Sequence, residues 1–145
     1  MTGLRRIRPA EYGEMRRALA AEGLPTQDLC AGSNRLYAFE EDGKVVGYAG
    51  LERHGPAALL RSVVVPRERQ GSGIGRRLVT AMLAEAGRRG HREVHLLTTT
   101  AGDFFERLGF ERVARERAPA ELLASAEFTR LCPASATCMR IRLAA

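Results

Sequence analysis

Three glycines stand at alternate positions just ahead of a predicted helix, in the stretch Gln-Gly-Ser-Gly-Ile-Gly at residues 70–75. Glycine loses more backbone freedom on folding than any other residue, so this cluster indicates a need for bare backbone. The first N–H groups of a helix lack internal acceptors and carry partial positive charge, and a pyrophosphate approaches them closely where no Cβ intervenes. The stretch predicts a phosphate-binding loop. Its donors are the main-chain amides of Gly71, Ser72, Gly73, Ile74, Gly75 and Arg76.

Two familiar phosphate motifs do not fit this stretch. A Walker loop needs Lys-Ser or Lys-Thr after its last glycine, but Gly75 is followed by Arg76 and Arg77. A Rossmann fingerprint counted from Gly71 needs a glycine where Arg76 stands. That fingerprint also follows the first strand of a βαβ unit, whereas this stretch follows about the fourth strand of the chain. A glycine-rich turn needed only for tight strand-to-helix packing is the remaining alternative.

The elements that position this loop follow from the hydrophobic pattern. Residues 4–7 and 58–65 are β-rich runs, and the second is apolar enough to lie in the middle of a sheet. Asp42-Gly43 predicts the turn of a hairpin over residues 35–52. The other expected elements are helices at 9–23, 24–30, 74–90, 101–110 and 119–131 and strands at 93–100, 111–117 and 136–143. This mixed order predicts one α/β or α+β domain over residues 1–145, around a single sheet.

Composition narrows the class of protein. The 145 residues are 45% apolar, enough for one core, and no run of about 18 apolar residues predicts a membrane span. The start of the chain has no apolar leader, which predicts a cytoplasmic location. The net charge of +6 comes from arginines, because Lys44 is the only lysine, and arginine suits an anionic ligand. These arginines are scattered, so nucleic acid is not an expected partner.

We expect structural roles for the three cysteines and for two of the three histidines. Cys30, Cys132 and Cys138 stand at no zinc-binding spacing, so we expect reduced thiols and no metal. We expect His91 to be exposed at the end of a helix. We expect His95, between two apolar residues, to be a satisfied histidine within a strand.

Two signatures at this spacing resemble those of a known family. Residues 70–75 match Q/R-x-x-G-x-G/A, which follows the splayed central strand of the GNAT superfamily of acyl-CoA-dependent N-acetyltransferases. Residues 101–110, Ala-Gly-Asp-Phe-Phe-Glu-Arg-Leu-Gly-Phe, nearly match a second signature of that family, A-x-x-F-Y-x-x-L-G-F. The order of elements agrees along the whole chain. The resemblance implies a single mixed, splayed central sheet flanked by helices, with acetyl-CoA as the acyl donor.

A finer resemblance concerns the acceptor. Residues 23–29 and 128–139 look like the corresponding stretches of the arsenic-resistance N-acetyltransferase group. This resemblance implies a small-molecule amine as substrate, amino-acid-like or arsenic-containing, and a monomer or homodimer.

The superfamily resemblance also implies which residues hold the donor. Main-chain groups of Val63, Val64 and Val65 correspond to the segment that pairs with the pantetheine arm. The loop that opens at Gln70 takes the pyrophosphate. Either Arg76 or Arg77 adds charge at the phosphates, or both lie on a solvated helix face. Phe105 stands where many members have a tyrosine that protonates the leaving thiolate, and a phenyl ring has no proton to donate. This departure leaves an alternative function, an acyl-CoA-binding sensor or interaction module without turnover.

Acetyl transfer also needs a neutral amine, and a base or a water chain usually removes the ammonium proton. Glu52 is the first candidate base because it ends a strand near the expected acceptor side. His54, at the following turn, is the second. A carboxylate on the acceptor would need a cation, and three arginines on or near strands could supply a bidentate fork: Arg35, Arg53 and Arg61.

Overall fold

The computed structural model describes residues 2–29, 34–125, 128–129 and 135–143. Its centre is an open seven-stranded sheet in the order β1-β2-β3-β4-β5-β7-β6. The strands are β1 Gly3–Arg6, β2 Asn34–Glu41, β3 Lys44–His54, β4 Ala57–Val64, β5 Glu93–Thr98, β6 Glu111–Arg112 and β7 Thr137–Arg142. Neighbouring strands are antiparallel except β4 and β5, which run parallel. The predicted mixed sheet is confirmed.

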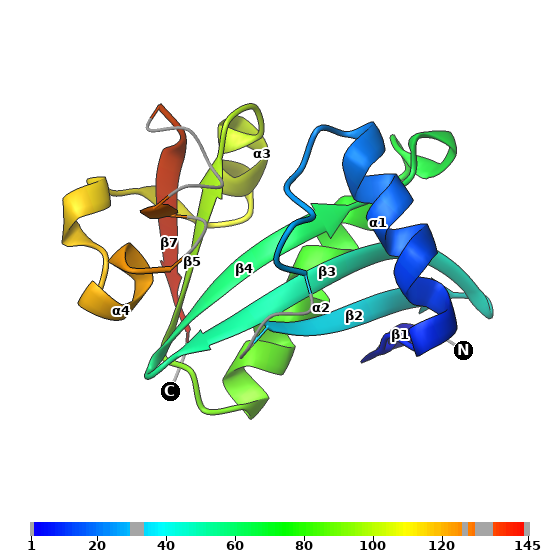
Figure 1. The fold of residues 1–145 in the computed structure, drawn as a ribbon, viewed down its shortest axis with the longest axis horizontal. Coiled ribbons are helices and arrows are strands. Elements are labelled where there is room, and N and C mark those ends of the chain that lie inside the picture. The colour runs from blue at the N-terminus through cyan, green and yellow to red at the C-terminus, as the bar shows by residue number, and fades with distance from the viewer. Residues whose placement is uncertain (1, 30–33, 126–127, 130–134, 144–145) are drawn as a thin grey trace.

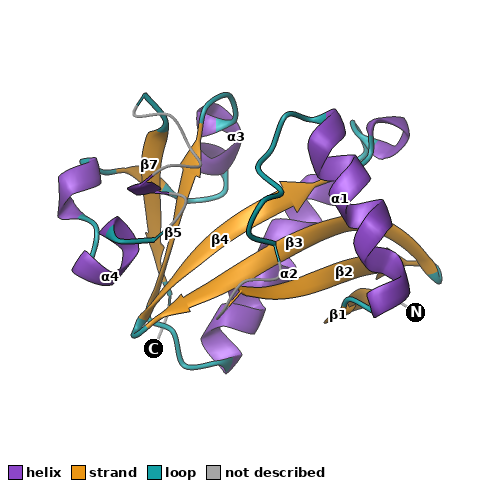
Figure 2. Cartoon of the chain, in the orientation of Figure 1, coloured by secondary structure: helices purple, strands orange, loops and turns teal. Residues whose placement is uncertain are grey.

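Helices cover both faces of this sheet (Figure 1 and Figure 2). They are α1 Tyr12–Ala21, α2 Ile74–Arg88, α3 Gly102–Arg107 and α4 Ala120–Leu123. α2 buries Leu78 and Met82 in the cluster that contains Leu51, whereas α1 buries Met15 and Leu19 in the cluster that contains Tyr48. Side chains alternate between the two faces of a strand, so the two helices lie on opposite sides of β3.

β4 and β5 pair over three positions only, Ala57 with Glu93, Ala58 with Val94 and Leu59 with His95. Beyond Leu59 the two strands diverge, as Figure 1 shows. β4 continues to Val64 beside β3, and β5 continues to Thr98 beside β7. Each strand is therefore paired on its outer edge while its inner edge faces the gap.

A bulge lies in the diverging part of β4. Tyr48 pairs with Val64 and Gly50 with Arg61, so β4 has one more residue than β3 across this step. Ser62 has φ of 58°, which is unusual for a residue with a side chain and marks local strain. The extra residue changes the alternation of β4, so both Arg61 and Val64 contact the α1 side of the sheet.

Some expected elements differ in the structure. Residues 24–29 form an irregular loop with a turn at 27–29 rather than a helix, and 111–117 form the two-residue β6 followed by a 3₁₀ turn at Arg115–Arg117. The predicted hairpin turn is confirmed, because Asp42 and Gly43 have φ of 53° and 78°. None of the described helices is long and apolar enough to cross a membrane.

Two glycines give a matched test of the packing between α2 and the sheet. A Cβ at Gly47 would lie 3.0 Å from Leu78 Cδ2 and 3.1 Å from the Val64 carbonyl oxygen, whereas one at Gly87 on α2 would meet nothing within 4 Å. We expect Gly47→Ala to lower the free energy of unfolding by about 1–3 kcal/mol. We expect Gly87→Ala to raise it by about 0.5–1 kcal/mol. Urea unfolding measures both, and a Gly47→Ala variant as stable as wild type would contradict this packing.

Candidate active site

A cavity of about 710 Å³ occupies the gap between β4 and β5. Its lining combines the glycine-rich loop, the inner edges of both strands, the loop after α1 and two aromatic rings of α3. The residues that line it include Leu24, Pro25, Leu60, Arg61, Val63, Val65, Gln70, Gly71, Gly73, Gly75, Arg76, Leu96, Thr98, Phe104 and Phe105. Most of the predicted donor-binding residues therefore lie around one cavity. Val64 and Ser72 are not among the lining residues, and the side chain of Val64 is buried beside α1.

The glycine-rich loop needs its glycines for backbone conformation as well as for access. Gly71 and Gly73 have φ of 90° and 81°, in the left-handed region that favours glycine, and Gly73 is the N-cap of α2. A Cβ at Gly75 would lie 3.4 Å from the ring of Phe104, so this glycine packs the helix closely against α3. Gln70 Nε2 donates to the Val65 carbonyl at 2.8 Å and ties the loop to the end of β4.

The start of α2 provides free donors at one end of the cavity. The first hydrogen bond of the helix runs from the amide of Arg77 to the Gly73 carbonyl, at 3.2 Å. The three amides before it, of Ile74, Gly75 and Arg76, therefore have no acceptor within the helix. The side chain of Arg77 binds Glu41 through Nε and Nη2, whereas Arg76 lines the cavity. Arg77 Nη1 also donates to the Ser72 carbonyl at 3.2 Å, so both arginines lie beside the loop, and Arg76 is the one that lines the cavity.

Two aromatic rings of α3 close the same cavity. Phe104 and Phe105 are in edge contact, with 5.0 Å between ring centroids, and Phe105 is in edge contact with Phe110 at 5.5 Å. Phe105 is buried, Phe104 is half-buried, and both residues line the cavity.

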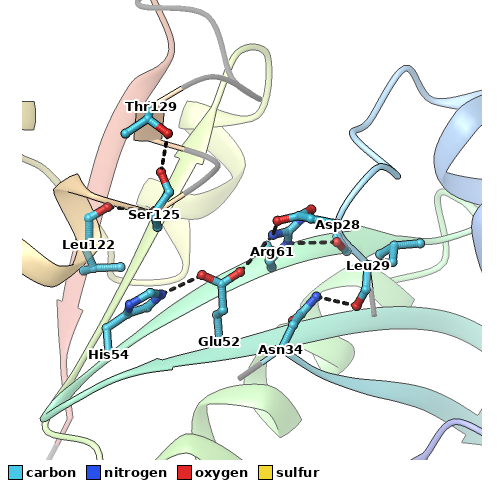
Figure 3. Close-up of polar contacts among 10 residues, drawn as sticks. Asp28, Leu29, Asn34, Glu52, His54, Arg61, Leu122, Ser125 and Thr129 are labelled. Atoms are coloured by element: carbon cyan, nitrogen blue, oxygen red, sulfur yellow. Dashed lines mark hydrogen bonds and ion pairs between the residues drawn. The ribbon is translucent and has the colours of Figure 1, made fainter. Parts of the chain in front are cut away.

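A charged cluster lies where β4 and β5 part, on the α1 side of the sheet (Figure 3). The fully buried guanidinium of Arg61 donates to both oxygens of Asp28, at 2.7 and 2.5 Å, and to Glu52 at 2.9 Å. The other oxygen of Glu52 lies 2.6 Å from His54 Nε2. Both candidate bases thus belong to one network with Arg61, which connects them to the cavity that Arg61 lines.

The network keeps Glu52 ionised. Burial raises the pKa of this carboxyl, but hydrogen bonds from His54 and Arg61 outweigh burial and hold the pKa below its ordinary value. An ionised Glu52 accepts a hydrogen bond from Nε2 of His54. This fixes the tautomer of a neutral ring and leaves the lone pair on Nδ1 to accept a proton.

The sequence did not identify Asp28, although a signal was present. Arg61 lies in an otherwise apolar strand predicted to be buried, and a buried guanidinium requires carboxylate partners. The same ion pairs change the interpretation of Arg61 as a cation for an acceptor carboxylate, since its guanidinium already binds two carboxylates of its own chain. Arg35 and Arg53 lie elsewhere, around a second cavity with Leu51 on the α2 side. The structure therefore does not bring the three candidate arginines together.

The remaining predictions concern histidines and cysteines. His91 is buried, with only 6% of its surface exposed, so the prediction of an exposed residue was wrong. His95 is buried within β5 with Nε2 2.7 Å from Glu93 Oε1, while its Nδ1 has no partner among the described residues. The cysteines are described in part. Cys30 and Cys132 lie outside the described residues, and burial raises the pKa of the Cys138 thiol. No three His, Cys, Asp or Glu side chains gather as a metal centre would require in the described part of the chain.

A family model for the Acetyltransferase (GNAT) domain matches residues 32–112, more than half of the chain. This chain belongs to the GNAT acetyltransferase domain family. The match runs from β2 through the glycine-rich loop and α3 to β6, and so contains both signatures. The superfamily resemblance is confirmed. The comparisons do not reach the arsenic-resistance group.

Individual relatives agree with this GNAT assignment. N-alpha-acetyltransferase 80 of Mus musculus is 40% identical over 70 residues, which are 46% of this chain and 22% of that protein. N-acetylglutamate synthase from Neisseria gonorrhoeae, solved with CoA and L-arginine, has a TM-score of 0.80 at 17% identity, over 99% of this chain and 34% of that one. A Mycobacterium tuberculosis protein solved with CoA has a TM-score of 0.75 at 22% identity, over 97% and 99% of the two chains. The GNAT domain thus spans only a part of the first two proteins, and the structural likenesses show the fold.

The buried position of Arg61 gives a stability prediction. Arg61→Met would leave the carboxylates of Asp28 and Glu52 without their buried cation, and we expect a loss of about 3–5 kcal/mol in the free energy of unfolding. The control is Arg77→Met, which removes an exposed pair with Glu41 and should change stability little. Urea unfolding at neutral pH measures both, and equal effects would contradict the burial of the network.

The lowered pKa of Glu52 gives a pH dependence. A carboxyl whose pKa is lower in the folded state stabilises the fold above its unfolded pKa, and this contribution is lost as the pH falls through the folded pKa. We expect wild type to be more stable than Glu52→Gln at pH 7 and the difference to shrink between about pH 5 and pH 3. A difference that grows on acidification would contradict the ion pairs of Glu52.

Proposed function

We propose that this GNAT domain transfers the acetyl group of acetyl-CoA to the amine of a small molecule. The observation that carries the proposal is the cavity between β4 and β5. It joins two unpaired strand edges to a helix start that offers free amides. A donor with phosphates at one end and an amide-containing arm matches both parts, because it can bind the helix start and pair with strand main chain.

Different parts of the cavity lining bind different parts of the donor. The loop amides from Gly71 to Arg76 take the pyrophosphate, with the charge of Arg76 beside them. The main chain of Val63 and Val65 pairs with the pantetheine arm, since the inner edge of β4 has no strand partner there. Only the main chain of Val64 contributes to this pairing, because its side chain is buried on the α1 side of the sheet.

The charged cluster supplies the base. Attack requires a neutral amine, which forms a C–N bond to the acetyl carbon as the C–S bond breaks. His54 accepts the ammonium proton at Nδ1, while Glu52 holds its Nε2–H and stabilises the imidazolium that forms. Arg61 fixes Glu52 from the opposite side. Arg61 therefore acts as a positioning residue in this proposal.

The cavity lining offers no tyrosine as acid for the leaving group among the described residues, and Phe105 stands where many members have one. A thiolate with a pKa of about 8.5 leaves without a dedicated acid. The proton comes from water or from the ammonium that the attack leaves. Phe105 instead excludes water around the thioester, together with Phe104.

For the acceptor, we propose a compound recognised through its ammonium group. Two carboxylates, Asp28 and Glu52, share the guanidinium of Arg61 in this cluster. A small amino-acid-like amine fits this cluster, and an arsenic-containing one is the finer proposal from the resemblance of residues 23–29 and 128–139. A panel of amines with and without arsenic, assayed by CoA release, tests it. The cytoplasmic location and the monomer or homodimer remain predictions.

Donor binding has a direct test in two glycines with the same backbone strain. Gly73, at the helix start, and Gly43, in the hairpin turn, both have φ near 80°. We expect acetyl-CoA and CoA to raise the melting temperature of wild type and of Gly43→Asp, with little effect of AMP. Gly73→Asp puts a carboxylate where phosphate binds and should abolish the shift. Equal shifts in both variants would place the donor elsewhere.

The base has a kinetic test. We expect Glu52→Gln and His54→Gln each to lower kcat by about 10²-fold or more, with the KM for acetyl-CoA changed by no more than about twofold. Glu116→Gln, an exposed acid on the turn at Arg115–Arg117, is the control. Unchanged kcat in both cluster variants would remove the base from this network.

Phe105 motivates a second function, an acyl-CoA-binding sensor or interaction module. The same panel of amines separates the two functions. Tight binding of acetyl-CoA with no CoA release for any amine, and no change on Phe105→Tyr, would favour the sensor. Turnover that depends on His54 would favour the enzyme.

A further inference from the structure

The cavity between β4 and β5 ends where the two strands come together. Leu59 and His95 form the pair beyond which the strands diverge, and paired strands lie only about 4.8 Å apart, which leaves no space between them. The next residue on each strand, Leu60 and Leu96, lines the cavity. These two leucines therefore lie at its narrow end, at the point from which the strands separate in Figure 1.

Both leucines are buried in the apolar core on the α2 side of the sheet. Each has only 2% of its surface exposed, and each belongs to the core cluster that contains Phe105. Their partners on the outer strands are Leu51 for Leu60 and Met139 for Leu96, and both partners belong to the same cluster. An apolar row thus crosses four strands, with the narrow end of the cavity in its middle.

The proposed donor would reach this end with its acyl group. The pyrophosphate loop follows the end of β4, and the pantetheine arm would pair with β4 around Val63. An arm that starts at the loop and runs back along β4 is directed towards Leu60. Arg61, the next residue, places its guanidinium on the α1 side with the two carboxylates. Alternation along β4 therefore separates the charged cluster from the apolar narrow end.

We propose that Leu60 and Leu96 limit the donor to short acyl chains, acetyl and propionyl, and are specificity-determining residues of this site. This inference rests on the proposed function, because it requires an acyl-CoA between β4 and β5. Each further methylene group would need space that the two buried leucines fill, and a well-packed core resists such added volume. A longer chain would have to displace these leucines or bend out of the gap, and either change weakens binding.

The affinity for acyl-CoAs of increasing chain length tests this limit without any acceptor amine. By titration calorimetry we expect wild type to bind acetyl-CoA and propionyl-CoA alike and hexanoyl-CoA at least about tenfold more weakly. Leu60→Ala and Leu96→Ala should each bring the affinity for hexanoyl-CoA to within about threefold of that for acetyl-CoA, because they open space at the narrow end. Leu60→Val and Leu96→Val disturb the core less and should change the ratio in the same direction.

The matched control is Leu78→Ala. Leu78 is fully buried in the same core cluster but is not among the residues that line the cavity. Its truncation should destabilise the fold and leave the ratio of the two affinities at the wild-type value. Wild type that binds hexanoyl-CoA as tightly as acetyl-CoA would overturn the proposal. A Leu78→Ala variant that changes the ratio as much as the cavity variants would overturn it too.

Turnover separates this inference from the proposed function. Chain-length selectivity that depends on Leu60 and Leu96, with no CoA release for any amine, would support the acyl site and remove the transfer reaction. Release of CoA from acetyl-CoA and hexanoyl-CoA with equal kcat/KM would support the transfer and overturn the chain-length limit. Failure of acetyl-CoA itself to bind would overturn both.

Discussion

The early divergence of β4 and β5 is the constraint on which the rest of the structure depends. Parallel strands that part after three pairs leave a row of main-chain N–H and C=O groups on each inner edge. Such groups need partners, and an edge left open inside a fold invites another extended segment. The bulge at Ser62, the rings of Phe104 and Phe105 and the loop at Gly71–Gly75 all lie around this gap. The fold thus leaves a gap that suits the proposed donor, an extended ligand with a phosphate end.

Arg61 links that gap to the chemistry on the α1 side of the sheet. It lines the cavity, and its buried guanidinium holds the carboxylates of Asp28 and Glu52 together. A buried charge of this kind is expensive unless its geometry is satisfied, so the loop that carries Asp28 must close over the strand for the cluster to form. The proposed base therefore depends on a contact between segments 33 residues apart in the chain.

The sequence predicted features that depend on local chemistry. The turn at Asp42-Gly43, the start of α2 after Gly73 and the order of the elements all follow from short-range rules for glycine and for hydrophobic period. It failed where tertiary contacts decide. The bulge at Ser62 has no sequence signature, and His91 is buried against the backbone at Gly55 and Ala57, a contact between distant parts of the chain. Alternation along a strand predicts that Glu52 and Arg53 lie on opposite faces of the sheet. Only the register of β2 and β3 shows which face each of them occupies.

The most direct test of the account is amide hydrogen exchange with and without acetyl-CoA. The account predicts that bound acetyl-CoA slows exchange in two places, the loop from Gly71 to Arg76 and the inner edge of β4 around Val63. Exchange in the hairpin turn at Asp42-Gly43 should not change. Protection of the loop alone would contradict the strand pairing. No protection in either segment at saturating acetyl-CoA would contradict the central claim that the gap between β4 and β5 is the donor site.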